Sequence, residues 1–596
     1  MAATAARLVS LSLHQGKRMT RFLQSCTIGT LIGVAIAAHA TTNADIILLH
    51  GRIITVDAQD QVVQALAIGA GRIIALGSDR AIARLAGPAT RIIDLRGRAA
   101  TPGLIDAHAH VLSMGLSDLF EIDLSGARQL LDVSEKVARR AATLRPGDWI
   151  VGGGWDEAKM SEHRYPTAAQ LDRAAPANPV WLLNTTGHFG AANSTALKLA
   201  GIGASTPTPV AGVIERGADG LPDGILKESA MDPVLAVIPK YSMEQRRHAI
   251  EHMLRATHSE GMTGFKDADI DQHDWEALRS VAADGTLSDY VCVLFHTLPT
   301  MDEARATLAR IRAAQHDVAG LKNSTLGVCG AKIYMDGSGV GRTGWMYADW
   351  NRSFTAVDIG NKGFPALDPD LYRRQVELFV AERVSVGTHA VGDRAIDWVA
   401  DTYAEALRLT PAKGLRLAII HDNIPTDHAI DVMADLQRRF DSGIPETQAE
   451  FLWWLGDAYS SSYGPARNQR LIPLRAYLDR GMIWAGGSDA NITPLAARFG
   501  LWASVARETL IGTNGKTPFG TAQSVDVHAA LRSYTIWAAR QLFIEEQTGS
   551  LEPGKSADIA IWDRDPYRIP AARLKDMVCD STIFQGKVVY ERAAGN

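Results

Sequence analysis

The chain has 596 residues, of which 46% are hydrophobic and 21% charged, an ordinary composition for a globular protein. Its 61 basic and 66 acidic side chains leave a formal net charge of −5, and no stripe of lysine or arginine runs along it. This balance argues against nucleic acid as a partner. The length is sufficient for several domains or for one large barrel with additions.

The N-terminal segment differs from the rest of the chain. Basic side chains precede the apolar segment 22–40, which ends in the A-x-A pattern of a cleavage site. We predict a secretory signal peptide cleaved after about Ala40, and hence a periplasmic or secreted protein. The apolar core is short for a membrane span, so an uncleaved anchor is the alternative, and no later stretch is apolar enough to cross a bilayer. Met19 is an alternative start, because residues 1–18 form a long polar leader.

Four cysteines are scattered along the sequence. Cys26 belongs to the predicted signal peptide, which leaves Cys292, Cys329 and Cys579. Three scattered cysteines do not form a disulfide framework, so we expect them to be buried as small apolar groups.

Patterning divides the mature chain into three parts. Short strands and turns fill residues 45–95 and return near the C-terminus, which predicts one β-sandwich built from both ends. Between them, helical patterns alternate with eight apolar strands, as in a closed (β/α)8 TIM barrel. The expected strands are 102–110, 261–269, 289–297, 326–336, 384–391, 415–421, 443–449 and 481–489.

The first two expected strands are too far apart for one crossover connection. We therefore expect an insertion subdomain at about 111–258. The resulting divisions are the signal peptide 1–40, the N-terminal sandwich part 41–100, the barrel 101–540 and the C-terminal sandwich part 541–596.

Two histidines stand at the end of the first expected strand, in "TPGLIDAHAH". Side chains alternate along a strand, so Asp106, His108 and His110 would share one face. Two neutral imidazoles at a strand end can bind one metal ion. The alternative is a solvated loop that happens to hold two histidines, and two ligands alone do not make a site.

Further polar residues follow other expected strands at the end where barrel enzymes place their chemistry. The fourth strand carries Lys332, with Tyr334 and Asp336 on the same face by its period of two. The fifth, sixth and eighth strands end at His389, His421 and Asp489, respectively. Four histidines, a lysine and an aspartate at successive strand ends indicate one shared site.

These motifs resemble those of the amidohydrolase superfamily, and within it family 3, the group that includes N-substituted formamide deformylases. The likeness spans about residues 45–590. It rests on seven segments: "TPGLIDAHAH", "GHFGAANSTAL", "GAKIYMDGSG", "THAVGDRAID", "RLAIIHDN", "AGGSDAN" and "GSLEPGKSADIAIWD". The resemblance implies a barrel joined to a sandwich, in agreement with the division above.

The resemblance also implies a ligand set and an activity, metal-dependent hydrolysis of a carbon–nitrogen bond. His108 and His110 would bind one metal, His389 and His421 a second, and Lys332, carbamylated by CO2, would bridge them. Asp489 would bind metal and act as the catalytic acid and base. Imidazole and carboxylate ligands suit zinc, as one or two divalent ions. The alternative for Lys332 is a free amine paired with Asp336 or with substrate, beside a single metal.

The sequence departs from the family pattern near the expected substrate. Asp422 and Asn423 follow His421, whereas family members more often place an acidic residue before this histidine. The seventh strand continues into Gln448, Glu450 and two tryptophans. These departures weaken any transfer of substrate identity. Asp106 lies on the face of the two histidines, where it would either hydrogen-bond one of them or play a structural role.

Specificity is expected to lie in the insertion and in neighbouring loops. Trp155, Trp345 and Trp453 could line an apolar pocket for a small apolar or aromatic substrate, although each could equally be ordinary packing. His188 could donate a hydrogen bond to the substrate carbonyl or be a structural histidine.

Three functions remain open. The first is an exported hydrolase of an amide-type bond in a small molecule. The second is a deaminase of a cyclic amidine, although such enzymes usually carry an H-x-x-E arrangement and lack the lysine. The third is a metal-free relative that acts as a binding protein. Exposed sandwich and barrel faces would also allow a homodimer.

Overall fold

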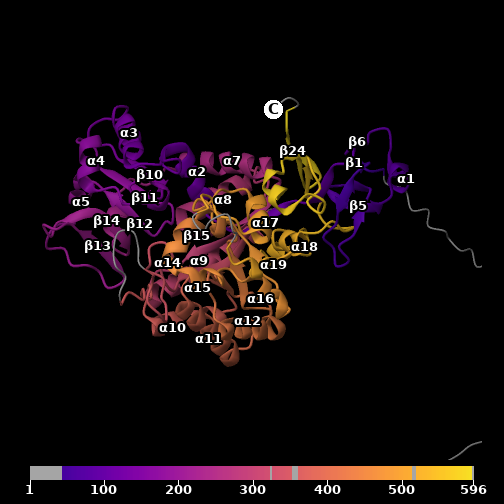
Figure 1. Ribbon diagram of the computed structural model, residues 1–596. Helices are drawn as coiled ribbons and strands as arrows, with labels where there is room; N and C mark the ends of the chain where they lie inside the picture. Colours follow the sequence, from indigo (N-terminus) through magenta and orange to yellow (C-terminus); the bar gives the residue numbers. More distant parts are fainter. Residues whose placement is uncertain (1–42, 322–324, 352–359, 513–518, 594–596) are drawn as a thin grey trace, which may run out of the picture. The chain divides into compact units, whose positions relative to one another are not determined.

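A computed structural model describes residues 43–321, 325–351, 360–512 and 519–593 (Figure 1). The predicted signal peptide, residues 1–40, lies outside this part of the chain. Within the described residues, no helix combines the length and the apolar character that crossing a bilayer requires.

The centre of the fold is a mixed α/β barrel of eight parallel strands, as predicted. Each strand is hydrogen-bonded to the next one along the chain, and each overlaps one of the eight expected strands. The strands are β8 (Leu104–Ala109), β15 (Met262–Ile270), β16 (Tyr290–His296), β17 (Leu326–Tyr334), β18 (Val386–Ala390), β19 (Ala418–His421), β20 (Ile444–Thr447) and β21 (Ala485–Gly486).

The first and last strands approach each other and nearly close the barrel. The backbone N–H of Asp489 donates to the carbonyl of His108 at 2.7 Å. The backbone N–H of Ser488 donates to the carboxylate of Asp106 at 3.1 Å, and its hydroxyl donates to the same carboxylate at 2.5 Å. These contacts tie residues more than 380 positions apart and set the position of Asp489.

Helices between the strands pack on the barrel through their apolar faces (Figure 1). In α11, for example, Ile396, Val399, Tyr403 and Leu407 are buried at the spacing of an amphipathic helix. The helices after the insertion are α7 (Met243–Ser259), α8 (Gln272–Ala283), α9 (Met301–Ala319), α10 (Pro369–Ala381), α11 (Asp393–Leu409), α12 (Asp427–Phe440), α13 (Glu450–Trp454), α14 (Gly456–Tyr463), α15 (Pro465–Asn468), α16 (Leu474–Asp479), α17 (Ala497–Ala506), α18 (Val527–Ser533) and α19 (Ile536–Gln541).

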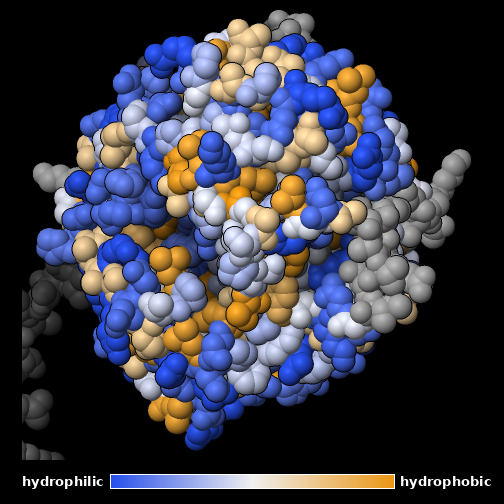
Figure 2. All heavy atoms as spheres, turned by 90° about the vertical axis from the view of Figure 1, so that its left-hand side faces the viewer, coloured by the Kyte–Doolittle hydropathy of each residue, from blue (hydrophilic) through white to orange (hydrophobic). Residues whose placement is uncertain are grey.

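A second sheet, of six strands in the order β13-β14-β12-β11-β10-β9, lies between β8 and β15 in the chain. Figure 2 faces this side and shows hydrophilic residues over most of the surface, interrupted by separate apolar patches. The elements are α2 (Val111–Phe120), β9 (Ile122–Asp123), α3 (Leu130–Ala141), β10 (Ile150–Trp155), α4 (Ala168–Ala174), β11 (Val180–Asn184), β12 (Phe189–Ala192), α5 (Ser194–Leu199), β13 (Gly212–Arg216), β14 (Pro222–Glu228) and α6 (Asp232–Leu235).

Two further sheets contain the strands near the chain ends. One is N-terminal, in the order β5-β4-β1-β6, and the other joins both ends, in the order β24-β23-β22-β7-β2-β3. Buried apolar residues of both sheets form one cluster. The elements are β1 (Ile46–Leu49), β2 (Arg52–Ile54), β3 (Val62–Val63), β4 (Ala65–Gly69), β5 (Arg72–Gly77), α1 (Asp79–Ile82), β6 (Arg91–Asp94), β7 (Ala99–Pro102), β22 (Ile559–Trp562), β23 (Cys579–Phe584) and β24 (Lys587–Glu591).

The cysteines correct one expectation. Cys292 on β16 and Cys329 on the neighbouring β17 form a disulfide, with 5.6 Å between their Cα atoms. Only Cys579 is a free, buried thiol among the described cysteines, as expected for it. The sequence spacing did not reveal the pair because strand register, not proximity along the chain, brings the two side chains together.

We expect the disulfide to stabilise the barrel. It links residues 37 positions apart in the sequence. A disulfide that closes a loop of this size typically adds about 2–4 kcal/mol to the free energy of unfolding. The Cys292→Ser, Cys329→Ser double variant should lose about this much free energy of unfolding in urea denaturation. Reductant should destabilise the wild type and leave the double variant unchanged; equal stabilities of the two oxidised proteins would contradict the prediction.

Candidate active site

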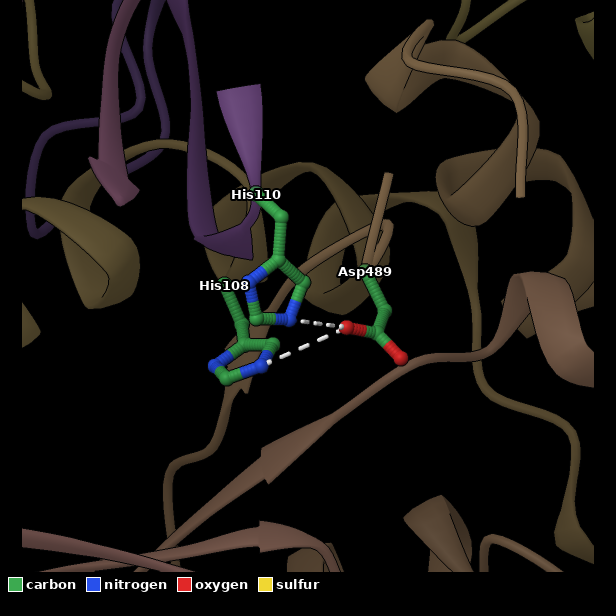
Figure 3. Close-up of side chains that lie close together, drawn as sticks. All are labelled: His108, His110 and Asp489. Atoms are coloured by element: carbon green, nitrogen blue, oxygen red, sulfur yellow. Dashed lines mark ion pairs between the residues drawn. The ribbon is translucent and has the colours of Figure 1, made fainter. Parts of the chain in front are cut away.

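His108, His110 and Asp489 converge at one rim of the barrel (Figure 3). His108 lies near the end of β8, His110 is the N-cap of α2, and Asp489 follows β21. The Oδ1 atom of Asp489 lies 3.4 Å from Nε2 of His108 and 3.2 Å from Nε2 of His110. The structure thus brings together three predicted ligands from both ends of the barrel sequence.

Hydrogen bonds orient both of these imidazole rings. The Nδ1–H of His108 donates to a carboxylate oxygen of Glu446 at 2.9 Å, and that of His110 donates to the carbonyl of Ala268 at 2.8 Å. Because these oxygens can only accept, each ring has its proton on Nδ1. The lone pair of each Nε2 is then directed towards Asp489.

Two more predicted histidines continue the cluster. His421 ends β19, and its ring centre lies 5.4 Å from that of His108 and 4.5 Å from that of His389 on β18. The Nδ1–H of His421 donates to the side-chain oxygen of Gln448 at 2.7 Å, which leaves Nε2 bare. His389 instead donates its Nε2–H to the carbonyl of Gly337 at 3.0 Å, which leaves Nδ1 bare.

This donor set fits a divalent metal ion. Two imidazole nitrogens face a buried carboxylate oxygen, the Oδ1 of Asp489, which accepts no well-aligned hydrogen bond from the described residues. Lone pairs that converge in a buried site repel one another unless a cation lies among them. Imidazole nitrogen and carboxylate oxygen are the ligands of catalytic zinc sites.

Burial and neighbouring charges set the protonation states. Burial lowers the pKa values of His389 and His421 well below that of free histidine, so both are neutral. Burial opposes ionisation of Asp489, but when His108 and His110 are protonated, hydrogen bonds from these rings outweigh burial and hold the pKa of Asp489 well below the usual range. For His110, the effect of burial is outweighed by Asp489, which raises the pKa of the imidazole.

Lys332 lies inside the same cluster. Its Nζ is 3.4 Å from Nε2 of His108 and 4.8 Å from the ring centre of Tyr334, and the side chain is buried. Burial lowers the pKa of Lys332 to about 8. Asp336, the alternative partner, instead accepts backbone N–H groups of Trp345, Val391 and Gly392 at 2.8–2.9 Å.

The backbone is strained where the site residues stand. His421 and Asp489 have φ angles of 72° and 60°, in the left-handed region that non-glycine residues rarely adopt. Such conformations cost of order 1 kcal/mol and persist where surrounding contacts enforce them. Here they turn the side chains at the ends of the strands into the site.

A small cavity of about 20 Å³, the inner cavity, adjoins the cluster. His188 from the insertion lines it, and its Nδ1 lies 2.9 Å from the Glu228 carboxylate. Phe451 stacks on His421, with 5.6 Å between the ring centres. The described lining comprises Thr186, His188, Ser338, Gly339, Val340, His389, Val391, His421, Phe451, Leu455, Tyr459, Asp489 and Ile492.

The three predicted substrate-binding tryptophans lie elsewhere. Trp155 is buried in the apolar core of the insertion and donates its indole N–H to the Leu182 carbonyl. Trp345 packs beside Trp398, and Trp453 packs against Phe499. Of the four predicted substrate contacts, the structure places only His188 on the inner cavity.

Sequence reasoning missed Glu446, the residue that orients His108. Glu446 lies in β20, is fully buried, and receives hydrogen bonds from His108 and from the buried Lys266 ammonium. It stands two residues before Gln448 in the predicted strand, so the period of two was a usable signal. Asp106, by contrast, accepts the backbone N–H of His108 at 3.0 Å and contacts neither imidazole by hydrogen bonding.

We expect Glu446→Gln to weaken metal binding. The substitution removes the charge that holds His108 and pairs with Lys266, and loss of such an outer partner typically costs 10–100-fold in affinity. Competition with a chromophoric chelator measures the change. Glu450→Gln is the matched control, because burial raises the pKa of Glu450 and its carboxyl contacts Thr493 rather than a histidine. Equal losses in the two variants would refute the role of Glu446.

A parallel barrel with histidines and an acidic side chain at the C-terminal rim is an arrangement suited to metal-dependent hydrolysis. Comparisons with known proteins agree: residues 91–590 match the amidohydrolase family, most of the chain. The chain belongs to the amidohydrolase family and is a hydrolase of carbon–nitrogen bonds.

Relatives match along nearly the whole chain. N-substituted formamide deformylase of Arthrobacter pascens is 29% identical over 93% of this chain and 99% of its own length. YtcJ of Bacillus subtilis is 26% identical over 91% of this chain and 99% of its own length. An uncharacterized metal-dependent hydrolase of Pyrococcus horikoshii shares the fold, with a TM-score of 0.66 and 22% sequence identity. The match covers 88% of this chain and 99% of that one. Atrazine chlorohydrolase TrzN of Arthrobacter aurescens, solved with zinc, has a TM-score of 0.50 and 16% sequence identity. The match covers 92% of this chain and 97% of that one.

Proposed function

We propose that this protein is an exported amidohydrolase that cleaves an amide-type bond in a small, apolar or aromatic substrate. One observation carries the proposal: bare imidazole nitrogens and the Asp489 carboxylate border a small cavity that is also lined by the apolar side chains of Phe451 and Leu455. The likeness to N-substituted formamide deformylase supports an amide rather than another carbon–nitrogen bond.

We assign His108, His110 and Asp489 to a first metal, with zinc as the preferred ion. His389, His421 and Lys332 would hold a second, with Lys332 carbamylated. A pKa of about 8 supports this modification, since it leaves part of the lysine as neutral amine at neutral pH. The amine adds to CO2, a nitrogen–carbon bond forms, and a proton leaves.

When bound, the metal supplies Lewis acidity that polarises the substrate carbonyl and lowers the pKa of water. Asp489 takes up a proton at its carboxylate and returns it to the departing nitrogen, which leaves as an amine. His188 is oriented by Glu228, which raises the pKa of the imidazole against the effect of burial, and the Nε2–H of the protonated ring would donate to the carbonyl oxygen. Phe451 and Leu455 exclude bulk water from this space.

Export is part of the proposal. Export is inferred from the basic residues near the N-terminus and from the A-x-A cleavage pattern at residues 38–40. The Cys292–Cys329 disulfide supports it, because disulfides persist in the periplasm or outside the cell and are rare in the cytosol.

A product-resolved screen tests the function. Zinc-loaded enzyme is incubated with small formamides, amides, carbamates and ureas, and with cyclic amidines. Release of a free amine together with a carboxylate supports the proposal. Ammonia release from an amidine would instead identify a deaminase. Protein that binds no metal and turns over none of the panel would identify a non-catalytic relative.

A further inference from the structure

A second, larger cavity lies beside the inner cavity. This outer chamber has a volume of about 310 Å³, is partly open to solvent, and lies between α2, the insertion sheet and the loop after β21. The inner cavity, at about 20 Å³, is far smaller than the roughly 300–1,000 Å³ of typical ligand pockets. A substrate longer than a small amide would therefore have to extend beyond it.

The wall between the two spaces is one side chain thick. Thr185 and Trp454 line the outer chamber, whereas their chain neighbours Thr186 and Leu455 line the inner cavity; Ile492 borders both. The wall is held by side chains and not by a strand. Trp454 donates its indole N–H to the Thr185 hydroxyl, which donates to the carbonyl of Ile492, both at 3.4 Å.

Bonds of this length are weak, so the wall can rearrange at low cost. The Ile492 side chain packs against Gly187, the insertion residue that follows the two threonines; a Cβ at Gly187 would lie 3.1 Å from its Cδ1. A rotation of Ile492 would therefore connect the chambers without moving a barrel strand.

The charged side chains that line the outer chamber are all acidic. Asp118, Glu121 and Asp123 line it, and none of the described lining residues is a lysine, arginine or histidine. Behind this lining, His252 pairs with Asp118 at 3.2 Å and Lys136 donates to the backbone carbonyl of Asp123, so the excess of negative charge is partial. Asp123 is exposed and uses Oδ1 for the backbone N–H of Ser125. Glu121 caps the C-terminal end of α2, where the helix dipole adds negative potential. An anionic group is disfavoured here, and a cationic one is favoured.

We propose that the outer chamber binds the far end of an elongated amide substrate, that this end is cationic, and that Ile492 sets how readily it passes. This proposal rests on the proposed amide hydrolysis and adds a substrate class to it. The proposal for the outer chamber depends on the wall that the two cavities share beside Asp489, and neither cavity alone supports it.

The test uses N-alkylformamides whose chain of two to eight methylenes ends in an ammonium, a methyl or a carboxylate group. For long chains, we expect kcat/KM to be about tenfold higher for the ammonium than for the carboxylate, because the acidic lining attracts the first and repels the second while solvent screening keeps each contact modest. Asp123→Asn should lower the ammonium-to-methyl ratio about two- to fivefold. Asp302→Asn, an exposed aspartate paired with Arg305 in α9, is the matched control and should keep the ratio.

Ile492→Ala and the milder Ile492→Val should both raise the long-to-short ratio of kcat/KM. Unchanged ratios in folded variants, or no dependence on tail charge in the wild type, would overturn the proposal while amide hydrolysis stands. If no formamide is turned over, calorimetric titration with 1,6-diaminohexane separates the two ideas. Binding that Asp123→Asn weakens supports the chamber without the reaction, and no binding rejects the chamber as well.

Discussion

Replacing Asp489 by asparagine is expected to reduce kcat by about 10²–10⁴-fold, the range that proton transfer by a positioned side chain contributes. Asparagine keeps an oxygen where Oδ1 faces the two imidazoles, so metal should be largely retained. It cannot, however, accept a proton and return it to the leaving nitrogen. Steady-state kinetics on the substrate found in the screen, together with metal analysis of the same sample, measures both effects.

The matched control for this variant is Asp435→Asn, an exposed aspartate that pairs with Arg438 and Arg439 on α12. It should keep full activity. Full activity in Asp489→Asn with metal bound would remove Asp489 from proton transfer. Loss of activity together with loss of metal would reduce its role to that of a ligand.

The second large effect is expected from loss of the metal itself. Dialysis against a strong chelator should abolish turnover and lower the thermal midpoint, since a ligand bound only to the folded state stabilises it by mass action. Zinc should restore both. If the protein dialysed against chelator holds no metal and keeps full activity, the reaction does not depend on a metal.

The His110→Gln variant tests whether His110 is a ligand of the metal in this site. Because it removes a nitrogen that faces Asp489, we expect a larger loss of zinc affinity than the 10–100-fold loss for an outer partner such as Glu446. His428→Gln is the control, since His428 is exposed and contacts Asp401 on the outside of the barrel. Equal zinc affinity in the two variants would exclude His110 as a ligand.

Local sequence patterns predict much of the barrel architecture. All eight barrel strands were expected from short apolar runs followed by turns, and each is present within a few residues. A strand is recognisable in this way because its period and its flanking glycines and prolines are properties of neighbouring residues. The same rule placed His108, His389 and His421 at strand ends.

Specificity residues were less accessible to local patterns. Trp155 and His188 both stand in glycine-containing segments of the insertion, yet one is core and the other lines the inner cavity. The choice depends on which face of the insertion sheet turns to the barrel, and a single sequence does not encode that in its periodicity. For the same reason, no local pattern marks Ile492 as a residue of the wall between the two cavities.

The sequence by itself determined the alternation of strands and helices, and the chemistry available at the strand ends, because both follow from residue type and short-range spacing. Tertiary structure alone decided the pairings across long separations. Glu446 meets His108 across 338 positions, and Cys292 meets Cys329 through strand register. Such contacts depend on barrel closure, where hydrogen bonds from Asp489 to the backbone of His108 and from Ser488 to Asp106 join the two ends of the barrel.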